Sequence, residues 1–125
     1  MNESGQVNES RDWVRQPAGQ LVWWALPILV AMVTSIARLP LRVVAFVWTG
    51  AFVWMGIGCL LNAMRCRRLH CFISGPVLMA GAAPMALIGL GVLSGHTLGV
   101  VIWTTAGLVM ASFVPEVIWG RYRAR

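Results

Sequence analysis

One short stretch of the chain holds the residues best suited to chemistry. All three cysteines, Cys59, Cys66 and Cys71, lie within it, and His70 directly precedes Cys71. Thiolate and imidazole groups are soft ligands that suit Cu(I), Hg(II) or Zn(II). The stretch therefore predicts a site for a soft metal ion or for a thiol-reactive species. The identity of the metal stays open.

Helical geometry predicts how these side chains meet. Cys59, Asn62 and Cys66 stand at positions i, i+3 and i+7, which share one face of a helix. A tight turn over residues 67–69 returns the next helix beside them. We therefore expect Cys66, His70 and Cys71 to converge at the membrane interface, with Cys59 about two turns deeper.

Polar residues are expected to support this cluster. Glu116 is the only acid outside the first twenty residues, and an acid within an apolar run is costly unless it is paired. Arg65, Arg68 and Arg121 are its candidate partners. Asn62 is predicted to form an interhelical hydrogen bond or to line a polar path to the thiols. Glu116 forms a structural ion pair in one interpretation and part of a proton or cation relay in the other.

A purely structural interpretation of the cluster stays open. Free cysteine packs as a small hydrophobic residue in helices, and arginine near a span end sets membrane orientation. The Cys-x-x-x-His-Cys pattern also lacks the doubled Cys-x-x-Cys that is typical of zinc sites.

Composition defines the class of protein that must position these residues. Of the 125 residues, 58% are hydrophobic and 11% are charged, against about 25% charged in soluble domains. This composition excludes a soluble domain, a disordered chain and a disulfide-rich secreted module. The fold class predicted is all-α: a polytopic membrane protein with four transmembrane helices in an antiparallel bundle.

Four apolar runs define the predicted spans, at about residues 21–37, 43–64, 72–93 and 98–119. The connections are short, so neighbouring helices must be antiparallel. The third run is rich in Gly and Ala, which predicts a central place in the bundle. Residues 1–20 form a polar cytoplasmic tail, expected to lack structure until about Arg15, and residues 120–125 form a basic cytoplasmic tail.

The arginines predict the orientation. Eight of the ten lie in the first tail, the second loop and the last tail, and only Arg38 and Arg42 lie on the other side. Arginine is retained in the cytoplasm, so both termini are predicted to be cytoplasmic and the protein to be a multi-pass protein of the inner (plasma) membrane. Residues 1–37 also fit a signal peptide ending at Ser35-Ile36-Ala37, whose cleavage would leave three helices.

The pattern Asn62-x-x-x-Cys66-x-x-x-His70-Cys71-x-x-x-Gly75-Pro76 resembles that of a group of small uncharacterised prokaryotic four-helix membrane proteins. The resemblance runs from the second span to the C-terminus and implies an architecture and a cysteine cluster, not a reaction. A looser similarity is to mercury-uptake membrane proteins, which pass Hg(II) inward through membrane cysteines. This chain has neither their adjacent cysteine pair nor a Cys-x-x-Cys.

These observations give two expected functions. The first is a non-enzymatic membrane protein that binds or passes a soft metal or thiol-reactive species at Cys59, Cys66, His70 and Cys71. The second is an accessory or structural subunit of a larger membrane complex or a homo-oligomer. Besides the lipid bilayer itself, anionic head groups are a further expected partner, at Arg65, Arg67 and Arg68. Nucleic acid is not expected, because the arginines punctuate apolar runs.

Overall fold

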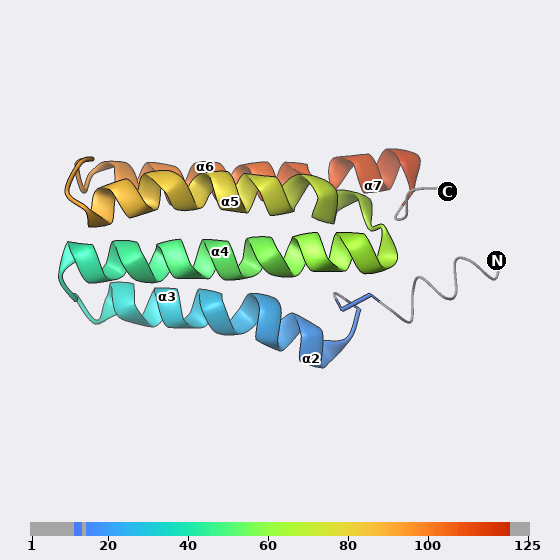
Figure 1. Ribbon diagram of the computed structural model, residues 1–125, viewed down its shortest axis with the longest axis horizontal. Helices are drawn as coiled ribbons and strands as arrows, with labels where there is room; N and C mark the ends of the chain where they lie inside the picture. Colours follow the sequence, from blue (N-terminus) through green and yellow to red (C-terminus); the bar gives the residue numbers. More distant parts are fainter. Residues whose placement is uncertain (1–11, 14, 121–125) are drawn as a thin grey trace.

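Four long helices run side by side in alternating directions in the computed structural model (Figure 1). The structure describes residues 12–13 and 15–120, and these contain helices and no strand. The first long helix combines α2 (Pro17–Gln20), the π-helical turn η1 (Leu21–Ala25) and α3 (Leu26–Ile36). The others are α4 (Leu41–Cys66), α5 (Leu69–Gly89), and α6 (Thr97–Ala111) followed by α7 (Val114–Trp119).

Each of the four is long and apolar enough to cross a membrane: Pro17–Ile36, Leu41–Cys66, Leu69–Gly89 and Thr97–Trp119. Burial separates two inner helices from two outer ones. In the most apolar 18-residue stretch of each span, 50% of α4 and 44% of α5 are buried, against 6% in the first span and 11% in the fourth. The centre that the sequence assigned to the third span is therefore shared between α4 and α5.

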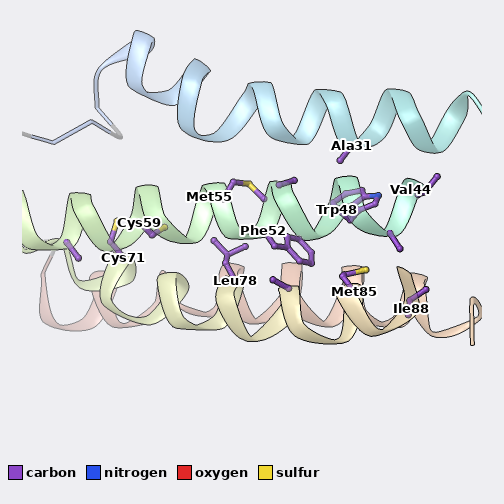
Figure 2. Packing of buried hydrophobic residues seen from close by; sticks show 14 residues of the cluster. Ala31, Val44, Trp48, Phe52, Met55, Cys59, Cys71, Leu78, Met85 and Ile88 are labelled. Carbon is purple, nitrogen blue, oxygen red and sulfur yellow. The ribbon is translucent and has the colours of Figure 1, made fainter. Parts of the chain in front are cut away.

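Small residues let α4 and α5 approach closely. A Cβ on Gly75 would lie 2.8 Å from Cδ2 of Leu60, and one on Gly56 would lie 3.0 Å from the Met79 side chain. Close backbone approach of this kind drives helix association where lipid is as apolar as the side chains. A row of buried apolar side chains continues along the two helices (Figure 2).

The first span accommodates a proline within its length. Pro27 has no N–H to donate to the carbonyl of Trp23, and its ring crowds that carbonyl. The helix widens here into η1, where the N–H of Leu26 bonds to the carbonyl of Leu21. A π-helical turn is a recognised way for a helix to absorb such a defect.

The third helix ends at Gly89, before the predicted end at Leu93. Gly91 adopts a left-handed conformation with φ 79°. Its N–H bonds to the carbonyl of Ile88, and that of Val92 bonds to Leu87, which is the Schellman pattern of a helix end. The apolar run concealed this stop because the residues after the glycine are themselves apolar.

The prediction of an unstructured tail until about Arg15 is wrong for two residues. Asp12 is fully buried and Trp13 is partly buried. The remaining tail residues at 1–11 and 14, and the C-terminal arginines at 121, 123 and 125, lie outside the described residues.

Candidate functional site

A two-residue turn joins α4 to α5 and brings the chemistry-bearing residues to one end of the molecule. Arg67 caps α4 in the left-handed conformation, with φ 56°, and its N–H bonds to the carbonyl of Ala63. Arg68 is extended and precedes α5 directly. The tight turn predicted from the sequence thus sets Cys66 and His70 at facing ends of adjacent helices.

Arg67→Gly should stabilise the protein modestly. The left-handed conformation costs a non-glycine residue roughly 1 kcal/mol, and the side chain of Arg67 is exposed. Part of this gain is offset by the greater freedom of glycine in the unfolded chain. Unfolding by SDS titration in detergent micelles measures the change, and Arg65→Gly, within α4, is the control that should destabilise.

Arg68 joins three separate parts of the chain. Its Nη1 donates to Oδ2 of Asp12 at 2.7 Å, and its Nε donates to Oε1 of Glu116 at 3.1 Å. The side chains of Arg68, Asp12 and Glu116 are 12%, 0% and 8% exposed. One buried guanidinium therefore connects the segment before the first span, the α4–α5 turn and α7.

Arg68 stays charged in this surrounding. Burial alone lowers the pKa of the guanidinium, since it penalises the charged form. The hydrogen bond to Glu116 and the charge of Asp12 outweigh burial, and the pKa of Arg68 is raised above its ordinary value. The two carboxylates thus share a permanent cation.

His70 lies between the carboxylate of Glu116 and the thiol of Cys71. Nδ1 of His70 is 2.6 Å from Oε1 of Glu116, and Nε2 is 3.4 Å from Sγ of Cys71. Nδ1 also lies 3.1 Å from Nε of Arg68. Nδ1 cannot accept there while it donates to Glu116, and the shorter bond to a carboxylate is the stronger one. We therefore assign the proton to Nδ1, which leaves Nε2 to accept from the thiol.

Phe113 packs against the flat face of the His70 imidazole. Its ring stacks on that of His70 with centroids 4.3 Å apart and planes at 22°. The same two residues line an apolar groove of about 370 Å³ between the first span and α6. His70 is thus fixed by a carboxylate, a thiol and an aromatic face together.

The three thiols have different partners. Cys59 of α4 and Cys71 of α5 lie near each other across the helix interface (Figure 2), and Sγ of Cys59 lies 3.1 Å from Oγ of Ser74. Cys66 instead donates to the carbonyl of Asn62 at 3.0 Å, within its own helix. All three are buried and free. Among the described residues, no group of three or more His, Cys, Asp and Glu side chains is arranged to hold a metal ion.

Asn62 links the thiols to the segment before the first span. Its Oδ1 accepts from the backbone N–H of Trp13 at 3.0 Å, and its Nδ2 donates to Asp12 at 2.9 Å and approaches Sγ of Cys71 at 3.5 Å. These partners fix which end of the amide carries the nitrogen. Asn62 thus has one partner on another helix, Cys71, as expected, and two partners in the segment before the first span.

Three tryptophan rings contact one another near Asn62 and Arg65. Trp13 stacks on Trp23 with centroids 5.3 Å apart, and Trp23 lies 5.3 Å from Trp54. The guanidinium of Arg65 lies over the ring of Trp13 at 4.4 Å. Of the three arginines suggested for Glu116, Arg68 thus makes the ion pair, Arg65 contacts Trp13, and Arg121 lies outside the described residues.

Sequence reasoning missed Asp12, Trp13, Ser74 and Phe113. The pair Asp12-Trp13 carried a usable signal, because a tryptophan beside an acid stands out in a tail of small polar residues. Ser74 and Phe113 carried none, since a serine or phenylalanine in an apolar helix has many possible neighbours.

The fold and this cluster define a class: small all-helical proteins with four membrane-compatible spans and a buried polar network at one end. No family model, no curated protein and no solved structure matches the chain.

Proposed function

We propose that the chain is a multi-pass membrane protein that binds a soft metal ion between the thiols of Cys59 and Cys71. The observation that carries the proposal is the proximity of these two thiols across adjacent helices (Figure 2), with Nε2 of His70 3.4 Å from Sγ of Cys71. Both thiols are fully buried in an apolar cluster. Buried thiolates favour soft cations, which form strong bonds to sulfur and gain little from water.

The number of thiols limits which metal ions the site can bind. Cu(I) and Hg(II) are stable with two sulfur ligands, whereas Zn(II) in structural sites takes four ligands in a tetrahedral arrangement. Three suitable ligands do not converge among the described residues. The geometry therefore favours Cu(I) or Hg(II) over Zn(II), and it favours Cys59 with Cys71 over the wider set that includes Cys66.

Binding replaces two S–H bonds with two S–metal bonds and releases two protons. The imidazole of His70 is an acceptor already beside one of these thiols, at 3.4 Å. Glu116 and Phe113 hold that imidazole in place. Groups that orient a ligand in this way commonly tune metal affinity.

The proposal places this end of the molecule at the cytoplasmic side of the inner membrane. Eight of the ten arginines would lie on that side, as the positive-inside rule requires. The cytoplasm is reducing, which keeps paired thiols free to bind metal.

Cu(I) titration of the reduced protein tests the proposal. The protein is purified in detergent without oxygen and is titrated against a chromophoric Cu(I) chelator. We expect about one equivalent bound by wild type and by Cys66→Ser, and none by Cys59→Ser/Cys71→Ser. All three cysteines are buried, so Cys66→Ser is a matched control. Equal binding by the double variant would refute the site, and loss in Cys66→Ser alone would restore the ligand set predicted from the sequence.

A second candidate function is that of an accessory subunit in a larger membrane complex. The favouring observation is the low burial of the outer spans, 6% and 11%, which leaves two broad apolar faces. Lipid also covers such faces, so the test is isolation in mild detergent from native membranes. A partner that co-purifies in fixed ratio supports this function, and a protein recovered alone contradicts it.

A further inference from the structure

The segment before the first span packs against Asn62, which lies beside the thiol of Cys71. Asp12 is fully buried although it precedes the first membrane-compatible helix. Its carboxylate accepts from Arg68 at 2.7 Å and from Asn62 at 2.9 Å. The backbone N–H of Trp13 adds a bond to the same Asn62. An acid in a polar tail is normally hydrated, so this position requires specific partners.

The ring of Trp13 is held in place by contacts with two helices. One neighbour of its ring is Trp23 of the first span, stacked at 10°, and another is the guanidinium of Arg65 at the end of α4. Aromatic stacking and a cation–π contact each contribute modest free energy. Trp13 is thus anchored by side chains from two different helices.

This segment is coupled to the thiols through one side chain. Nδ2 of Asn62 donates to Asp12 and lies 3.5 Å from Sγ of Cys71. Departure of Asp12 and Trp13 would leave Asn62 without two of its partners and would expose it to water. Water and small solutes would then have a polar route to Cys71.

From this geometry we propose that Asp12 and Trp13 form a lid that controls access of thiol-reactive species to Cys59 and Cys71. The inference rests on the proposed thiol site and adds its regulation. The lid contacts are polar and aromatic, and they lie outside the apolar cluster of α4 and α5. Such contacts open at lower free energy than a packed core does.

Alkylation kinetics test the lid without any metal. The reduced full chain, carrying Cys66→Ser, is treated with iodoacetamide in detergent, and mass spectrometry follows modification of Cys59 and Cys71. Loss of a buried charge-assisted hydrogen bond makes opening easier, so we expect Asp12→Asn to raise the alkylation rate about tenfold or more. Trp13→Ala should act in the same direction.

Trp119→Ala is the matched control, because Trp119 is 74% exposed on α7. It should leave the rate unchanged. Rates in Asp12→Asn and Trp13→Ala equal to that of the control would overturn the lid. Circular dichroism and gel filtration establish that each variant is folded. If Asp12→Asn fails to fold, Trp13→Phe replaces it, and its alkylation rate should rise less than that of Trp13→Ala.

The lid and the metal site can fail separately. Faster alkylation with no Cu(I) binding supports the lid and refutes the proposed function. Cu(I) binding with unchanged alkylation rates supports the metal site and refutes the lid.

Discussion

Arg68→Gln is expected to be the most destabilising single substitution at this end of the molecule. It removes the cation shared by Asp12 and Glu116, whose side chains are 0% and 8% exposed. Breaking a buried ion pair from one side costs about 3–5 kcal/mol, because a charge is left without compensation. Here two carboxylates lose their common partner, so we expect a loss in the upper part of that range.

SDS titration in detergent micelles measures this loss as the change in the free energy of unfolding. Arg68→Lys is the matched variant: it keeps the charge but cannot reproduce two hydrogen bonds from one planar group, so it should be intermediate. Arg68→Gln/Asp12→Asn removes one charge of each sign and should recover part of the stability. A double variant less stable than Arg68→Gln would show that the charges of Arg68 and Asp12 do not compensate one another.

The number of long helices and the all-helical class could be predicted from the sequence, because apolar runs bounded by arginines are strong signals. The exact ends could not. The Schellman turn at Gly91 ends α5 within an apolar run, and hydropathy does not register a single left-handed glycine. The π-helical turn before Pro27 is likewise a local response to a missing N–H, which an apolar pattern does not encode.

The candidate site was predictable in composition but only partly in geometry. The ion pair of Glu116 followed from the cost of an unpaired acid in an apolar helix, and Arg68 supplies it. The role of Cys66 did not follow, because a shared helical face does not fix where a thiol points. Cys66 donates to the carbonyl one turn earlier, a local option open to short polar side chains. Asp12 was missed because it is distant in sequence from Asn62 and Arg68 and lies in a segment with no helical periodicity.

Glu116→Leu should remove the hydrogen bonds that hold α7 against His70 and Arg68, next to the thiol of Cys71. Oε1 of Glu116 accepts from Nδ1 of His70, from the His70 backbone N–H and from Nε of Arg68. Leucine would leave the His70 backbone N–H without this acceptor in a buried position, whereas Nδ1 of His70 would be free to accept from Nε of Arg68, 3.1 Å away. An unsatisfied buried donor costs about 1–3 kcal/mol, and Arg68 also loses one of its two carboxylates, so we expect a total loss near 3 kcal/mol. The loss should stay below that of Arg68→Gln, since Arg68 would keep its pair with Asp12.

Glu116→Gln is the matched control for this prediction, because its amide oxygen can still accept from Nδ1 of His70 at the cost of the charge. The free energy of unfolding should fall by only about 1 kcal/mol, which is the difference between a charged and a neutral hydrogen bond. The ring of Phe113 stacks on His70 and precedes α7 directly, so loosening α7 should also free the imidazole from Cys71. We therefore expect faster alkylation of Cys71 in Glu116→Leu than in Glu116→Gln. Equal stability and equal alkylation rates in the two variants would mean that Glu116 acts through its charge alone and does not hold His70 in place.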